Sequence, residues 1–286
     1  MAIHVTARLS GAPRAHACLL RRSLVALALG AACGAASADA RAQARTFYLD
    51  RLPVAGAPDD GIALWRPEMG ERTRFFGQLG IGLSVEPFRV EDEIRAAGRR
   101  ATVERDLGQP VDLQVIEYAD VGVEIRHRVA LEAMLPVTVF ERGSPTNEAG
   151  VAPTAVDLRP AAPMDLRLGA RALVYENASR SVALGVDGAV WLPTGDAYSY
   201  GGDGSPSGSI GAALEVDLRR AFVVLDTSVH FRPAGAVNDF RVGDEWCYGL
   251  GAFVPLRGGA LRLGAELFGS TGITGATAFT AANTPL

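Results

Sequence analysis

The chain has 286 residues with 32 acidic side chains and 28 arginines, no lysine, and a formal net charge of −4. A net-acidic chain without a basic cluster argues against a nucleic-acid partner. Beyond the N-terminal leader no apolar run approaches the roughly 18 residues that a transmembrane helix needs, so the sequence excludes a helical membrane protein.

The first 38 residues have the organisation of a secretory signal peptide. A start with four arginines and no acidic residue precedes a short apolar core at residues 24–34, and Ala36-Ser37-Ala38 supplies the small-x-small cleavage pattern. A second cleavage pattern at residues 42–44 and a lipidated N-terminus at Cys33 are alternatives. With the leader removed Cys247 is the last remaining cysteine, so the mature chain cannot form an intrachain disulfide.

Residues 39–72 predict an irregular periplasmic arm. Three prolines and the turn-forming run Ala57-Pro58-Asp59-Asp60-Gly61 interrupt any periodicity. Aromatic and aliphatic side chains at residues 47–52 form a docking patch, which we expect to fold against or into the mouth of a barrel.

Alternation of apolar and polar residues begins at Thr73 and is clearest at residues 209–232. There Ile210 and Leu214 alternate with small or charged residues, and the pattern resumes after Arg219-Arg220. A period of two on both sides of a tight turn predicts a β-hairpin. Its strands run about 10–12 residues, which is typical of tilted strands that cross a bilayer rather than of soluble proteins. The prediction is an all-β fold, an antiparallel up-and-down transmembrane β-barrel.

The same pattern predicts nine long strands in total. They cover residues 73–85, 111–126, 129–139, 165–174, 182–192, 209–218, 221–232, 246–256 and 261–268. The connections alternate in length, beginning with a long polar loop at residues 86–110. Because outer-membrane barrels have short periplasmic turns and longer outer loops, this order places the N-terminus in the periplasm, where secretion delivers it.

An odd number of strands predicts an incomplete barrel. An open sheet would leave two long unpaired edges in lipid, where each unsatisfied backbone group is costly. We therefore expect the barrel domain at residues 73–286 to be incomplete at its C-terminus, with at least one further strand, and three as the preferred number, in the full gene product.

One face of the predicted strands is aliphatic and the other carries charges of both signs. In a membrane the aliphatic face, with Leu184 and Leu214, contacts lipid and the charged face lines the lumen. The expected lumen-lining residues are Arg126, Arg128, Glu132, Arg167, Arg171, Asp187, Glu215, Asp217, Asp226, Arg262 and Glu266. Such buried charges must pair or stay hydrated. Glu117 interrupts the aliphatic face, which predicts an interfacial position or a bulge.

Several segments resemble one known family. They are FYLDRL and GAPDDGIALWRP in the arm, then FFGQLGIGLSVEPFR, RVALEAMLPVTVFERG, LRLGARALVYEN and VWLPTGD. Together they resemble the N-terminal β-barrel of outer membrane protein A-type proteins (the OmpA family) of myxobacteria and related Gram-negative bacteria, over residues 47–286. The resemblance implies a cell-envelope protein in outer-membrane lipid, inserted by the barrel assembly machinery. It also implies binding to peptidoglycan through a separate domain, which these 286 residues do not include.

Three functions are compatible with these patterns. If arginine–carboxylate pairs and the arm fill the lumen, the protein is structural or anchors the envelope. If the lumen stays open, it is a diffusion porin for small polar solutes. A soluble β-sandwich binding protein would also alternate, but with shorter strands. Mixed signs favour the first function, because a selective pore more often lines itself with one sign.

No motif points to catalysis, a cofactor or a metal. Asp226, Ser228 and His230 share one face, but same-face neighbours on a strand lie about 6.6–7 Å apart, too far for a nucleophile–base contact. Residues 201–204 form a single glycine-aspartate element without a repeat, and the two histidines beyond the leader lack metal-ligand spacing. The sequence therefore predicts a protein that is not an enzyme.

Overall fold

A single continuous antiparallel sheet dominates the computed structural model, which describes residues 3–6, 48–50, 52–95, 102–143, 158–233, 235–237, 240–257 and 261–273. Its nine long strands are β2 (Arg74–Arg95), β3 (Thr102–Ile125), β4 (Val129–Arg142), β6 (Leu166–Glu176), β7 (Val182–Leu192), β8 (Ser207–Asp217), β9 (Phe222–Phe231), β12 (Glu245–Leu256) and β13 (Leu261–Gly272). Each pairs with the next in chain order. The predicted all-β up-and-down fold is confirmed.

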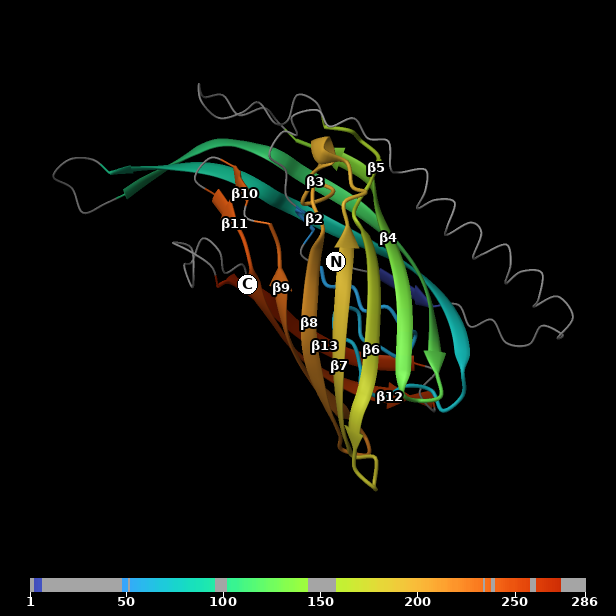
Figure 1. The fold of residues 1–286 in the computed structure, drawn as a ribbon. Helices are drawn as coiled ribbons and strands as arrows, with labels where there is room; N and C mark the ends of the chain where they lie inside the picture. Colours follow the sequence, from blue (N-terminus) through green and yellow to red (C-terminus); the bar gives the residue numbers. More distant parts are fainter. Residues whose placement is uncertain are drawn as a thin grey trace, which may run out of the picture.

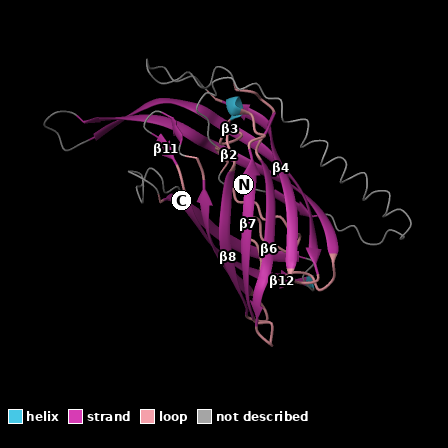
Figure 2. Ribbon diagram, in the orientation of Figure 1, coloured by secondary structure: helices cyan, strands magenta, loops and turns pink. Residues whose placement is uncertain are grey.

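The sheet is curled, so that β12 and β13 pass behind β6 and β7 in the view of Figure 1. This arrangement is a partly closed barrel rather than the two packed sheets of a β-sandwich. The connections β4–β6, β7–β8 and β9–β12 gather at one end of the sheet, here called the long-loop end (Figure 2). The turns β3–β4, β6–β7 and β8–β9 lie at the other end, the short-turn end.

The remaining elements are short. They are β1 (Ile3–Thr6), β5 (Ala162–Pro163), β10 (Gly235–Val237), β11 (Phe240–Val242) and the 3₁₀ turn η3 (Ala197–Ser199). β1 comes from the predicted leader and pairs with the edge of β2. The leader's cleavage patterns, Cys33 and everything after residue 273 lie outside the described residues. In the described ranges, no helix is long and apolar enough to cross a membrane.

The prediction of a long loop at residues 86–110 is wrong. Residues 86–95 and 102–110, expected as part of one long polar connection, continue β2 and β3 as a paired ribbon that extends to Arg95 opposite Thr102. The ribbon reaches away from the rest of the sheet (Figure 1). Register shifts at Val85 and Phe88 mark its start. Away from the curled sheet neither face of a two-stranded ribbon has to be apolar, and the alternation therefore disappears although the backbone remains paired.

The two faces of the sheet differ as the alternation predicts. Convex-face side chains are strongly exposed, including Phe75 at 68 %, Leu225 at 52 % and Leu263 at 69 %. Concave-face side chains are buried, and both Glu124 and Ala213 are 1 % exposed. An apolar exterior around a polar interior is the inverse of a soluble protein and is typical of membrane barrels.

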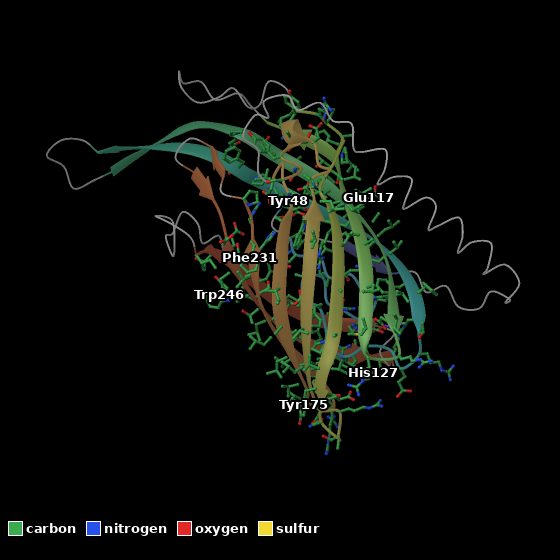
Figure 3. The ribbon with its side chains drawn as sticks, in the orientation of Figure 1. Tyr48, Glu117, His127, Tyr175, Phe231 and Trp246 are labelled. Atoms are coloured by element: carbon green, nitrogen blue, oxygen red, sulfur yellow. The ribbon has the colours of Figure 1, made fainter. Side chains whose placement is uncertain are left out.

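Glu117 lies on the convex face and is exposed, between Ile81 of β2 and Val137 of β4. The β-bulge expected near it lies just before it, between Val115 and Ile116, and does not turn its side chain inward. Figure 3 shows Glu117 toward the long-loop end of the sheet, away from His127 and Tyr175 at the short-turn end.

Candidate functional site

The concave face of the sheet is occupied by the arm, which we define as the described residues between Tyr48 and Arg72. The arm is irregular, as predicted, and it lies within the lumen, as expected for a segment that folds into the mouth of a barrel. Its buried residues include Leu49, Val54, Ala57, Leu64 and Met69. The arm thus supplies buried side chains to the core on the concave face of the sheet.

Hydrogen bonds to the loops fix the first residues of the arm at the long-loop end. The backbone N–H of Tyr48 donates to Oδ1 of Asp203 over 2.9 Å, and that of Leu49 donates to the carbonyl of Tyr200 over 3.1 Å. Arg232, 7 % exposed, bonds to the Tyr48 carbonyl and forms ion pairs with Asp203 at 2.6 Å and Glu245 at 3.2 Å. The contact therefore combines backbone bonds with a buried charge cluster.

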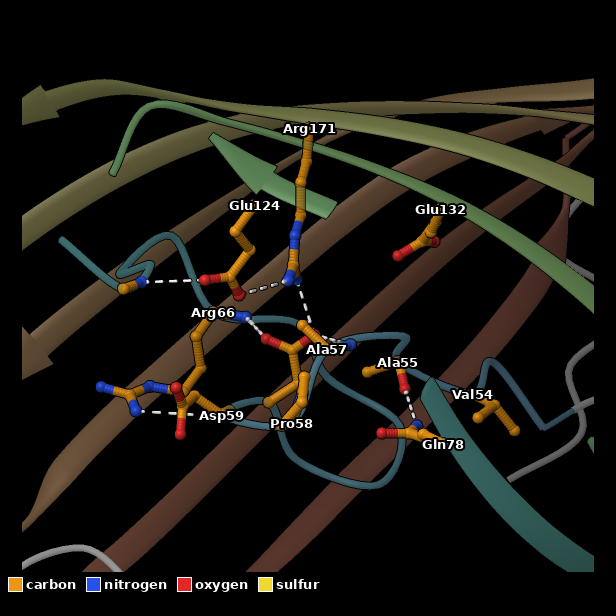
Figure 4. Close-up of polar contacts among 12 residues, drawn as sticks. Val54, Ala55, Ala57, Pro58, Asp59, Arg66, Gln78, Glu124, Glu132 and Arg171 are labelled. Atoms are coloured by element: carbon orange, nitrogen blue, oxygen red, sulfur yellow. Dashed lines mark hydrogen bonds and ion pairs between the residues drawn. The ribbon is translucent and has the colours of Figure 1, made fainter. Parts of the chain in front are cut away.

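A buried ion triad lies where the arm crosses the middle of the lumen (Figure 4). One guanidinium nitrogen of Arg171 is 2.6 Å from Asp60 of the arm, and the other is 3.8 Å from Glu124 of β3. All three side chains are at most 5 % exposed. Asp60 also accepts the backbone N–H groups of Ala57 and Arg66, each over 2.9 Å. The carboxylate thus closes the tight turn of the arm and joins it to the sheet.

Two further strands hold the same turn from the other side. Arg262 of β13 donates to the carbonyls of Pro58 and Asp59, while Arg74 of β2 pairs with the Asp59 side chain. Glu266 of β13 accepts the N–H groups of Ile62 and Ala63 over 2.9 and 2.8 Å. The arm therefore bridges β2 and β13, the first and last long strands of the sheet.

Small residues on the strands make room for the large side chains of the arm. A methyl group built on Gly185 would lie 2.7 Å from the Trp65 ring, and one built on Gly249 would lie 2.2 Å from Leu64. Either substitution would therefore collide with the arm. Nearby, Arg66 bonds to Glu215 of β8 and lies 3.9 Å above the ring of Phe222.

The arm reaches the short-turn end just before β2 begins. The carbonyl of Met69 contacts the imidazole of His127 in the β3–β4 turn, and His127 is 3.1 Å from Glu176. Glu71 pairs with Arg180 of the β6–β7 turn at 2.8 Å. The arm therefore runs the length of the lumen from one end to the other.

Six of the eleven predicted lumen residues form hydrogen bonds or ion pairs inside the lumen. They are Glu132, Arg167, Arg171, Glu215, Arg262 and Glu266. Arg167, for example, pairs with Glu132 at 3.1 Å and donates to the Val54 carbonyl over 2.9 Å. Asp187 and Asp226 line the space that the arm leaves unfilled. Among the described residues neither of these two forms an ion pair.

Three predicted lumen residues lie elsewhere. Arg126 and Arg128 belong to the β3–β4 turn and are exposed, with Arg126 at a φ of 47°. Asp217 is exposed at the end of β8, where it accepts the N–H of Arg219 over 2.6 Å. The alternation continues past the point at which each strand leaves the lumen, which explains these errors.

Several residues that contribute to the site were not identified from the sequence. Glu124 and Arg74 share the inward phase of β3 and β2, so the alternation could have identified both. Asp59, Asp60 and Arg66 lie in the aperiodic arm, where no pattern gives a side chain a direction.

A cavity of about 270 Å³ remains in the lumen. Trp65 of the arm and Trp191, Asp187, Asp226 and Ser228 of the strands are among its lining residues. His230 also lines it, stacked on Trp191 at 4.4 Å and bonded to Ser207 at 3.3 Å. In the parts of the chain that the structure describes, no three His, Cys, Asp or Glu side chains are grouped to hold a metal ion.

The pKa values of Tyr48 and Asp165, which lie outside the long strands, are raised by their surroundings. Burial, together with the charge of Asp50, raises the pKa of the Tyr48 phenol well above its usual range. Burial also raises the pKa of Asp165 to about 6, although the N–H groups of Gly195 and Asp203 oppose this by bonding to its carboxylate. Native Asp165 thus retains a proton that the unfolded chain loses near pH 4, and its contribution to stability falls as the pH rises toward 6.

No family model matches the chain, and no curated protein or solved structure is significantly similar to it.

Proposed function

We propose that this chain is an outer-membrane β-barrel protein with a plugged lumen and a structural, envelope-anchoring role. The observation that carries the proposal is the arm, which occupies most of the concave face and makes ion pairs and hydrogen bonds with β2, β3, β6, β8 and β13. Arginines and carboxylates pair with one another within the lumen. Such an interior stabilises the barrel and leaves little room for solutes.

Membrane residence is supported by the convex face. Leucine, isoleucine and valine side chains cover it, and exposed aromatic side chains stand toward its ends, with Phe231 and Trp246 on one side and Tyr175 on the other (Figure 3). Aromatic side chains favour the two interfaces of a bilayer. The predicted leader, outer-membrane lipid, the barrel assembly machinery and the resemblance to the OmpA family fit the same proposal. Peptidoglycan is a partner only through a further domain.

A diffusion porin is the second candidate, and one observation favours it. The cavity of about 270 Å³ shows that the arm does not fill the lumen completely. That volume suits about ten water molecules or one small solute and, within the described residues, is no continuous channel through the lumen, so the structural role remains the preferred function.

Fractionation tests the proposal. The protein expressed with its leader is expected in the outer-membrane fraction, soluble only in detergent, and with a gel mobility that changes on heating because a folded barrel resists the detergent. Recovery as a detergent-free periplasmic monomer would contradict membrane residence.

A charge on the convex face is expected to be costly at mid-membrane. Leu225 is paired with Leu214 and Leu250 and is 52 % exposed, so Leu225→Arg should lower the free energy of unfolding in lipid vesicles by about 2–4 kcal/mol. Leu218 is 59 % exposed but lies in the β8–β9 turn, so the matched control Leu218→Arg should cost about 0–1 kcal/mol. Equal costs in a urea titration would show that the convex face does not contact lipid.

A further inference from the structure

The direction of the arm shows at which end of the barrel the chain enters the lumen. Successive arm residues contact groups progressively farther along β6 and its turn: Val54 meets Arg167, Asp60 meets Arg171, and Glu71 meets Arg180. The chain therefore passes through the lumen toward the short-turn end, where β2 starts at Arg74. It enters the lumen at the opposite end.

The entry point is held by the long loops. Tyr48 and Leu49 bond to Asp203 and Tyr200, which belong to the β7–β8 connection. The Arg232 cluster, which connects the end of β9 to Glu245 of β12, holds the Tyr48 carbonyl. Figure 3 shows Tyr48 at this end and His127 and Tyr175 at the other. These contacts are buried and include ion pairs, so the fold holds the chain at Tyr48 in a defined position.

We infer that the mature N-terminus is presented at the long-loop end, on the cell surface, and not in the periplasm where secretion delivers it. The inference rests on the proposed function, in which the long loops face outward. A chain extends by at most about 3.3–3.6 Å per residue, so a residue two positions before Tyr48 lies within about 7 Å of that mouth. The arm therefore connects β2, which starts at the short-turn end, to a chain entry at the long-loop end.

Tyr48 lies beside the β7–β8 connection, so an epitope fused to the mature N-terminus is expected to be accessible on the same side as that connection. The short turns remain on the opposite side, and β7 spans the distance between the two ends with 11 residues.

Cysteine labelling in intact cells tests the inference. In a Cys247→Ser background, single cysteines are placed at Thr46→Cys, at Tyr198→Cys in the β7–β8 connection, and at Ala178→Cys in the β6–β7 turn. Tyr198 is 48 % exposed and Ala178 is exposed. A membrane-impermeant maleimide is expected to label Thr46→Cys and Tyr198→Cys at similar rates in intact cells, and Ala178→Cys only after the outer membrane is permeabilised. Heat modifiability of each variant verifies its folding.

The outcomes separate this inference from the proposed function. If Thr46→Cys follows Ala178→Cys while Tyr198→Cys is labelled, the barrel is oriented as proposed and the surface position of the N-terminus is overturned. If Ala178→Cys alone is labelled in intact cells, the orientation is reversed, and the surface position is again overturned. A soluble protein labelled equally at all three positions would overturn the membrane proposal and the inference together.

Discussion

Deletion of residues 45–66 is expected to turn a barrel with little or no stable conductance into one that conducts in steady steps. The deleted segment carries the turn that Arg171, Arg262 and Glu266 hold in the lumen. Without it those side chains face water, and the space along the concave face becomes continuous. Single-channel recording in a planar bilayer measures the change, and heat modifiability establishes that the deletion variant has folded.

The opened lumen is expected to prefer cations. The strand residues that face it include four arginines and seven acids: Arg74, Arg167, Arg171, Arg262, Asp120, Glu124, Glu132, Asp187, Glu215, Asp226 and Glu266. An excess of one sign along a pore selects ions of the opposite sign. The reversal potential in a salt gradient reports this preference.

A synthetic peptide of residues 45–66 provides the control, since adding it should reduce the conductance of the deletion variant if the arm is the plug. A steady, large conductance from the intact protein, unchanged by the deletion, would instead identify a porin and argue against the anchoring role.

Arg171→Ala is expected to lower the free energy of unfolding by about 3–5 kcal/mol, because it leaves two buried carboxylates, Asp60 and Glu124, without their shared cation. The matched control is Arg180→Ala, which breaks the pair with Glu71 at the short-turn end. Both side chains of that pair are more than half exposed, so its loss should cost about 0–1 kcal/mol. Urea titrations in lipid vesicles measure both variants.

A double variant separates the energy of the Asp60–Arg171 ion pair from the effect of shortening each side chain. If Asp60 and Arg171 interact directly, adding Asp60→Ala to Arg171→Ala should cost less than the sum of the two single changes, with a coupling of about 0.5–3 kcal/mol. Similar costs for Arg171→Ala and Arg180→Ala would show that the buried triad does not support the fold.

The strands were predictable to the extent that one face of each contacts the surroundings and the other contacts the lumen. β7 runs over residues 182–192 as the alternation predicts, since every second residue there faces one uniform environment. The same rule fails for residues 86–110, where a ribbon leaves the curled sheet and no longer has two different environments. It also fails at Arg126, Arg128 and Asp217, where the strands have already ended or emerged from the lumen.

The lumen chemistry was only partly predictable. The alternation identified Arg167, Arg171 and Glu266 as inward, but it could not name their partners, because pairing depends on which side chains from distant segments meet. Glu132 is a neighbour of Arg167 across the sheet, whereas Asp60 reaches Arg171 from more than a hundred residues away along the chain.

By itself the sequence determined the all-β character, the up-and-down order of the strands and the split between an apolar and a charged face, because each depends on a local period of two. The position of the arm was decided only by the tertiary structure. An aperiodic segment has no intrinsic direction, and its place follows from the charges and gaps that nine strands present to it once they curl. Asp60 beside Arg171, Leu64 above Gly249 and Tyr48 under the long loops are contacts that no local pattern encodes.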